Sequence, residues 1–172
     1  MSYCKDNDEV HYNPWVETRV VAKFNVTDTS SATDIMYNDA TSQFSEIEID
    51  GVVQPSVVSS YTFDTTGEHT VKYTLSDPTC IGEGAFYGCY RLTDITICSS
   101  VTYIEDDAFY YCSNLETITS LAITAPTIEN HTFQYVKTGG TLTVPTGSTG
   151  YDTWMSAEDY YLGAYNWTKV EQ

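Results

Sequence analysis

The fold is decided by two consecutive stretches of the chain, TCIGEGAFYGCYRLTDITICSSV at residues 79–101 and TYIEDDAFYYCSNLETITSLA at residues 102–122. Apolar residues of the first stretch recur in the second after 23 positions. The pairs are Ile81 and Ile104, Phe86 and Phe109, Cys89 and Cys112, Leu92 and Leu115, and Ile95 and Ile118. Five pairs at a single offset indicate an internal repeat, which predicts a solenoid or a similar stacked array.

A third and looser copy follows the first two. Ile128 and Phe133 lie 24 residues after Ile104 and Phe109. The strand-like run at residues 142–144 comes late in this copy, and we therefore expect an insertion within residues 134–140.

A period of 23 residues lies in the range of leucine-rich repeats. The run Leu92-x-x-Ile95-x-Ile97 fits the Leu-x-x-Leu-x-Leu core of such repeats, and Ile95 and Ile97 would point inward from a short strand. Because one coil cannot bury its apolar face alone, neighbouring coils stack and share a core. We expect this repeat ladder to consist of Ile81, Phe86, Cys89, Leu92, Ile95, Ile104, Phe109, Cys112, Leu115, Ile118, Ile128 and Phe133.

The repeat resembles the BspA-like leucine-rich repeat family. The resemblance is carried by Ile81, Gly82, Ala85, Phe86, Gly88, Cys89, Leu92, Ile95, Ile97, Ser100 and Val101. The ending is similar to the terminal cap of that family, with Thr-Leu-Thr-Val-Pro-Thr-Gly at residues 141–147 followed by Tyr151, Trp154 and Trp167. The resemblance covers residues 79–172. Cys98 stands where the family has proline, and the second strand breaks at Ser120.

This resemblance implies a non-catalytic surface protein, because such repeats occur in bacterial adhesins and in structural proteins of gut bacteriophages. We expect a bacteriophage virion component, such as a capsid decoration or a head fibre. The alternative is a fragment of a secreted bacterial adhesin that binds a host protein or a glycan. The first residues contain no apolar export signal, which favours the virion. The expected partners are other virion or surface proteins, including further copies of the chain.

The N-terminal half has the alternating pattern of β-strands, so we expect a mainly β fold. We expect an arm over residues 1–14, a small immunoglobulin-like β-module over 15–77, the repeats over 78–147 and a cap over 148–172. Strands are predicted near residues 16–26, 44–52, 57–63 and 68–75, with a turn at Asp50-Gly51. A helix is predicted over residues 150–156. Since so few coils leave the core open at both ends, we expect the β-module and the Trp154/Trp167 segment to cover those ends.

Charge and composition exclude several classes of function. Seven basic residues against 24 acidic ones give a net charge of −17, which argues against nucleic acid and against an anionic membrane surface. No apolar run approaches the roughly 20 residues that would insert into a bilayer.

The sequence contains no motif for catalysis or for a cofactor. His11, His69 and His131 are scattered, and phosphate-loop, zinc-protease and serine-hydrolase motifs are absent. We therefore expect no enzyme activity. The nine-residue spacing of Cys80, Cys89 and Cys98 does not suit structural zinc, so we expect free buried thiols, with a disulfide as the alternative.

Tyrosine is unusually frequent, with 15 residues in the chain. Tyr87, Tyr90, Tyr110 and Tyr111 flank the phenylalanine and cysteine positions of the repeats, on loops. Exposed tyrosines offer contact area at a low cost in conformational entropy, which favours an interaction surface. The other interpretation is that these rings only pack between adjacent coils.

Overall fold

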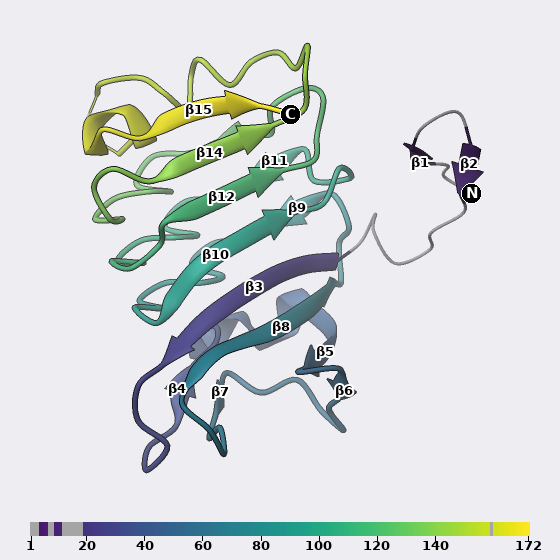
Figure 1. Cartoon of the computed structure of the whole chain (residues 1–172), viewed down its shortest axis with the longest axis vertical. Coiled ribbons are helices and arrows are strands. Elements are labelled where there is room, and N and C mark those ends of the chain that lie inside the picture. Colours follow the sequence, from purple (N-terminus) through teal and green to yellow (C-terminus); the bar gives the residue numbers. More distant parts are fainter. Residues whose placement is uncertain (1–3, 7–8, 12–18, 159) are drawn as a thin grey trace.

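The computed structural model describes residues 4–6, 9–11, 19–158 and 160–172 (Figure 1). The predicted arm over residues 1–14 and the start of the predicted strand at residues 16–18 therefore lie largely outside the described residues. Within the arm, β1 (Cys4–Asp6) pairs antiparallel with β2 (Glu9–His11).

One sheet of eight strands runs the length of the molecule (Figure 1). Its parallel half is made of the repeats and the C-terminal strand, namely β10 (Leu92–Ile97), β12 (Thr117–Ser120), β14 (Thr141–Val144) and β15 (Thr168–Glu171). Its antiparallel half comes from the N-terminal segment, namely β3 (Arg19–Val26), β8 (Gly67–Leu75), β5 (Phe44–Ile49) and β6 (Val52–Val53). The halves join where β3 pairs antiparallel with β10, so the N-terminal strands extend the same sheet.

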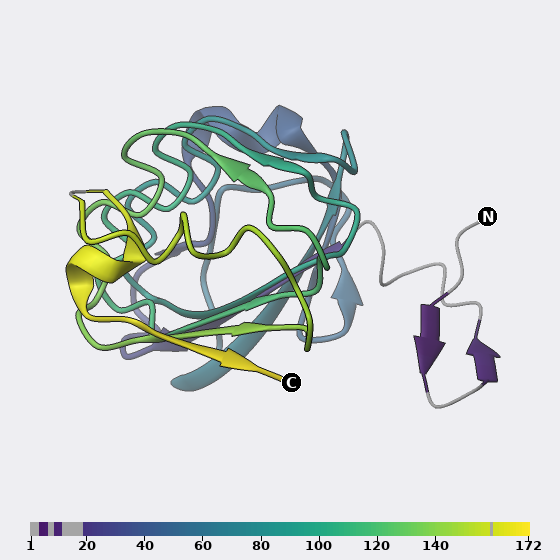
Figure 2. The ribbon, with the colours of Figure 1, turned by 90° about the horizontal axis from the view of Figure 1, so that it is seen from above.

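The chain winds back behind this sheet through short strands. β9 (Cys80–Ile81), β11 (Tyr103–Ile104) and β13 (Thr127–Ile128) form a parallel sheet of three strands. Seen from above, the coils lie over one another, with the long sheet along one side and η1 (Asn38–Gln43) on the opposite side (Figure 2). This is a β-solenoid of about four turns, and it confirms the predicted mainly β solenoid. The immunoglobulin-like character of the N-terminal part stays a prediction.

The strand register corrects one detail of the repeat. β10 and β12 pair Ile95 with Ile118, at the expected offset of 23. The next pairings, Ile104 with Ile128 and Ile118 with Leu142, both have an offset of 24. The predicted insertion within residues 134–140 is therefore wrong. The single extra residue lies between the end of β12 and the start of β13, where the chain turns through residues 121–126.

The residues of the predicted repeat ladder lie inside the solenoid. All are buried except Ile128, which is half-buried against the core. Phe86, Phe109 and Phe133 stack in a row, which we call the phenylalanine ladder, with ring centroids 5.4 and 5.6 Å apart and ring planes within 9° of parallel. Aromatic rings close both ends of this row. Trp154 lies 5.2 Å from Phe133, and Tyr73 of β8 lies 5.2 Å from Phe86.

Two smaller predictions about local structure are wrong. Residues 150–156 form turns instead of a helix, because Tyr151 and Trp154 cover the end of the core from a chain that bends at Gly150. The Trp154 indole donates to the carbonyl of Pro126 at 2.9 Å and so fixes this bend. The predicted strand over 57–63 shrinks to β7 (Ser60–Tyr61), since its only partner among the described residues is the two-residue β4 (Thr33–Asp34).

In the part of the chain that the structure describes, the helices are short. The structure describes η1 and η2 (Leu162–Tyr165), both 3-10 helices. Within the described ranges, no helix is long and apolar enough to cross a membrane.

Candidate interaction surface

Each coil makes the same turn between its short back strand and its long front strand. The turn has two positions with left-handed backbone, at the same offsets of 23 and 24 residues as the strands. The first position is occupied by Gly84, Asp107 and His131, with φ of 59°, 56° and 60°. The second is occupied by Gly88, Tyr111 and Tyr135, with φ of 70°, 59° and 62°.

Left-handed backbone suits glycine, and it costs other residues about 1–2 kcal/mol each. The first coil uses glycine at both positions. The second and third coils place Tyr111 and Tyr135 at the second position, where the turn itself needs no side chain. Both rings are exposed, at 49% and 45%. Packing inside the solenoid therefore does not account for these two tyrosines.

The rings on this side of the molecule form a continuous row. Tyr87 stacks on Tyr110 with centroids 5.1 Å apart, and Tyr110 meets Tyr135 edge-on at 5.3 Å. Tyr111 lies 4.7 Å from Tyr135, and Tyr37 lies 5.4 Å from Tyr87. We call these five residues the tyrosine ladder. Four of them are between 38% and 49% exposed, and Tyr110 at the centre is half-buried, which raises the pKa of its hydroxyl.

The tyrosine ladder differs in part from the predicted interaction surface. The structure places Tyr87, Tyr110 and Tyr111 in the ladder, but Tyr90 lies apart from it and its ring contacts Arg91. Tyr135 was missed, although the 24-residue offset from Tyr111 could have indicated it.

Tyr37 lies before the repeats that were predicted from the sequence, and no predicted pattern singled it out. The peptide N–H of Tyr37 donates to the carbonyl of Ala85 at 3.1 Å. This bond continues a series of backbone hydrogen bonds between neighbouring coils. In that series the N–H of Phe86 donates to the carbonyl of Ala108, and the N–H of Phe109 donates to the carbonyl of Thr132. The segment before η1 therefore acts as one more layer of the solenoid.

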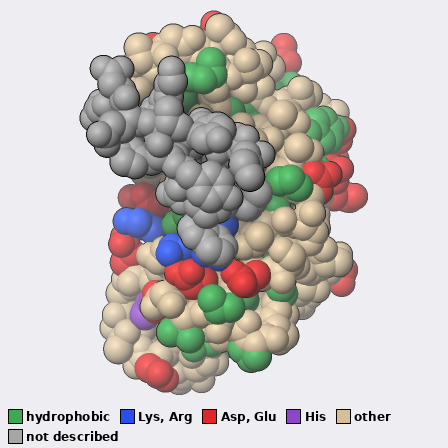
Figure 3. All heavy atoms as spheres, turned by 90° about the vertical axis from the view of Figure 1, so that its right-hand side faces the viewer, with side chains coloured by type: hydrophobic (Ala, Val, Ile, Leu, Met, Phe, Trp, Pro, Cys, Tyr) green, Lys and Arg blue, Asp and Glu red, His purple; other side chains and the backbone are tan. Residues whose placement is uncertain are grey.

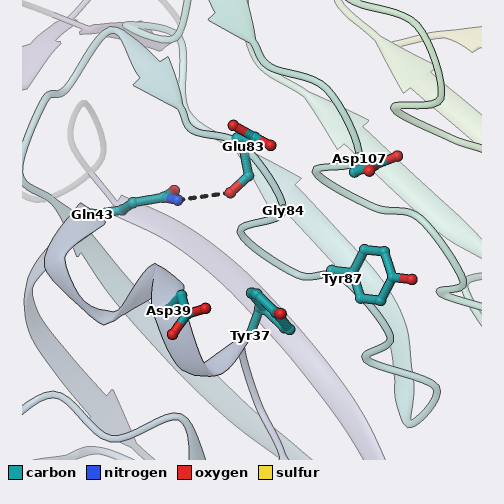
Figure 4. Close-up of a pocket in the computed structure, with 7 residues that line it drawn as sticks. All are labelled: Tyr37, Asp39, Gln43, Glu83, Gly84, Tyr87 and Asp107. Atoms are coloured by element: carbon teal, nitrogen blue, oxygen red, sulfur yellow. Dashed lines mark hydrogen bonds between the residues drawn. The ribbon is translucent and has the colours of Figure 1, made fainter.

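A cavity of about 620 Å³ opens beside the first two rings of the ladder. It is lined by Tyr37, Asp39, Gln43, Glu83, Gly84, Tyr87 and Asp107. Figure 4 shows the carboxylates of Asp39, Glu83 and Asp107 around the two tyrosine rings. The Gln43 side chain forms one wall, because its Nε2 donates to the carbonyl of Glu83 at 2.9 Å.

Further along the same turns, acidic side chains meet a histidine. Asp106 lies 3.3 Å from Nδ1 of His131, and one ligand atom each from Asp106, Asp107 and His131 fall within 4.8 Å of one another. All three residues are half-exposed, so water reaches them and the grouping alone defines no metal site. Burial and the neighbouring Asp106 raise the pKa of Asp107.

The basic side chains that the structure describes are engaged elsewhere. Arg19 and Lys72 contact Glu48 on the front of the N-terminal strands, at 3.0 and 2.6 Å. The other described ion pairs of lysine are Lys23 with Glu68, Lys137 with Glu116, and Lys169 with Asp152. Figure 3 views the molecule from the right-hand side of Figure 1, and the basic side chains visible there gather in one group beside acidic ones. Among the residues that the structure describes, no lysine or arginine lines the cavity.

The described histidine and cysteine side chains that could have indicated catalysis have structural contacts instead. His69 bonds Asp50 at 2.7 Å and the carbonyl of Thr65 at 2.9 Å. Cys89, Cys98 and Cys112 are buried free thiols, and burial raises the pKa of each. Cys80 is also free and half-buried, with its pKa raised to about 11 by burial. Such thiols stay protonated at neutral pH and are poor nucleophiles.

A stacked solenoid with an exposed aromatic row defines a repeat protein of the binding or scaffold class. More narrowly, residues 37–155 match the BspA type Leucine rich repeat region in six copies, which is more than half of the chain. The chain therefore belongs to the BspA-type leucine-rich repeat family, and the match begins well before residue 79. Repeats of this kind generally mediate protein–protein interaction and generally have no catalytic role. No curated protein and no solved structure matches the chain.

Proposed function

We propose that this protein binds another protein through the tyrosine ladder. The observation that carries the proposal is the placement of Tyr111 and Tyr135, which are exposed on left-handed backbone where the first coil has Gly88. Strained residues persist where function requires them, and the strain here serves no contact inside the core. Tyrosine rings in a row supply a rigid contact area that is partly apolar and partly hydrogen-bonding.

The setting that we propose is a bacteriophage particle, in which the chain is a capsid decoration, a head fibre or a similar component. The family match supports a surface and binding repeat module, and the bacteriophage setting rests on the resemblance described in the sequence analysis. In that setting, copies of the chain would associate symmetrically. The second candidate is a bacterial surface adhesin, in which the same ladder would contact a host protein or a glycan.

Tyrosine footprinting tests the binding surface directly. The isolated chain and the chain in its native assembly are nitrated with tetranitromethane, and each tyrosine is quantified by peptide mass spectrometry. We expect Tyr111 and Tyr135 to be protected at least about fivefold in the assembly, whereas Tyr90, which is equally exposed in the isolated chain, stays reactive. Equal nitration of all three residues in both samples would overturn the proposal.

The setting is tested by the mass of the chain in its native source. A chain of 172 residues that co-purifies with virus particles supports the virion component. A longer parent found on the bacterial surface supports the adhesin and excludes the virion setting.

A further inference from the structure

We infer that the cavity between η1 and the first coil receives a lysine or arginine side chain from a basic segment of a partner protein. This inference rests on the proposed function, since Tyr37 and Tyr87 belong both to the tyrosine ladder and to the cavity wall.

Carboxylates from three separate parts of the chain line the cavity. Asp39 comes from η1, Glu83 from the turn of the first coil, and Asp107 from the turn of the second coil. In Figure 4 these carboxylates stand on different sides of the space instead of meeting at one point. An extended cation with several N–H donors could reach more than one of them, as charge-assisted hydrogen bonds require.

The aromatic walls narrow the choice of cation. The rings of Tyr37 and Tyr87 line the cavity together with the three carboxylates and are inclined at 57° to each other, while Tyr110 stacks on Tyr87. Ring faces attract ammonium and guanidinium groups, but they supply no ligand atoms to a hard metal ion. A volume of about 620 Å³ is in the range of pockets for organic groups and is far larger than a metal site needs.

The charge of the whole molecule favours a basic partner. The net charge is −17, and the described lysines and arginines have contacts away from the cavity. The cavity therefore has no cation from its own described residues, and the field of the protein attracts a basic segment toward it. A peptide is favoured over a free small cation because the tyrosine ladder continues from the cavity across the next two coils and offers contact area to the flanking residues.

The test uses a fluorescein-labelled peptide, Gly-Tyr-Gly-Arg-Gly-Lys-Gly, and the full chain. We expect saturable binding, weakened about tenfold or more when Asp39→Asn and Glu83→Gln are combined. The matched control combines Glu116→Gln and Asp152→Asn, which removes two carboxylate charges outside the cavity lining and should change the affinity less than about twofold. Thermal melting verifies that both variants fold, and Tyr37→Leu tests the aromatic wall without a change of charge.

Each outcome decides between interpretations. Equal weakening in both charge variants would show unspecific attraction to an acidic protein and would overturn the inference. Tetramethylammonium that competes as well at the same concentration would show a small-cation site and would exclude the peptide. If the peptide does not bind but the nitration footprint shows protection of Tyr111 and Tyr135, the inference fails and the proposed function stands. If the peptide binds in the cavity without such a footprint, the proposed function of the ladder fails instead.

Discussion

The phenylalanine ladder and the tyrosine ladder are made by neighbouring residues of the same turns, yet they differ in order. Centroid spacings agree, at 5.4 and 5.6 Å inside and 5.1 and 5.3 Å outside along the two rows. Ring orientations agree less well, because the inner planes lie within 9° of parallel, whereas the outer pairs range from 9° for Tyr87 and Tyr110 to 82° for Tyr110 and Tyr135. Tyr87 and Tyr110 are one repeat apart, and the stacking of strands sets their spacing as it does for the inner rings, whereas a uniform orientation along the whole row occurs only in the closed core. A surface with adaptable rings at a fixed spacing is suited to contact with a partner.

The largest effect is expected from a substitution that interrupts the phenylalanine ladder. Phe109→Ala should lower the free energy of unfolding by about 3–5 kcal/mol, because it removes a fully buried ring between two others. Urea denaturation followed by circular dichroism measures this loss. The matched variant Tyr110→Ala, one residue further on, should cost clearly less, since its ring is only half-buried. Equal losses would contradict the distinction between the two ladders.

An intermediate effect concerns the ion pairs of Glu48 on the outer face of the N-terminal strands. Lys72 and Arg19 hydrogen-bond the carboxylate of Glu48 and lower its pKa. A lowered pKa in the folded state stabilises the protein above the ordinary pKa of glutamate, and this stability is lost as the pH falls through the lowered value. Glu48→Gln should therefore cost about 1 kcal/mol at pH 7 and flatten the acid limb of the stability curve. Urea midpoints between pH 7 and pH 3 measure both effects, and an unchanged acid limb would contradict the assignment.

The smallest effect concerns backbone strain in the outer row. Tyr111→Gly relieves about 1–2 kcal/mol of left-handed strain and adds about 0.5–1 kcal/mol of freedom to the unfolded chain, so we expect a gain of about 0.5 kcal/mol. The reverse control, Gly88→Ala, should be destabilising by a similar amount. A loss of stability in Tyr111→Gly would show that the ring has a packing role and would weaken the argument for a contact surface.

The sequence predicts the repeats well because their evidence is periodic. A fixed offset between Phe86 and Phe109 identifies both the coil and the inward direction of its rings. The join between the halves could not be predicted, because β3 reaches β10 across about 70 residues and no local pattern records that pairing. The helix prediction over 150–156 failed for a related reason, since a spacing of three between Tyr151 and Trp154 serves a capping turn equally well.

The candidate site was predictable only in its periodic part. Tyr87, Tyr110 and Tyr111 follow from the repeat, and Tyr135 follows from the same arithmetic once the offset of 24 is known. Tyr37 and Asp39 belong to a segment before the repeats that were predicted from the sequence, and this segment joins the surface through a layer of backbone hydrogen bonds. The cavity therefore could not be predicted from the sequence, because its carboxylates come from segments that are separated by up to about 68 residues.

The four described thiols make the opening of the solenoid measurable by chemical modification. Cys89 and Cys112 lie one coil apart in the core, and the Cys112 Sγ donates to the carbonyl of Phe86 at 3.1 Å. An alkylating reagent can reach these sulfurs only when stacked coils separate, so their rate of modification reports the opening of the core. Cys80 lies nearer the surface and reports local fraying instead. Comparing the rates shows whether the coils open one at a time or all together.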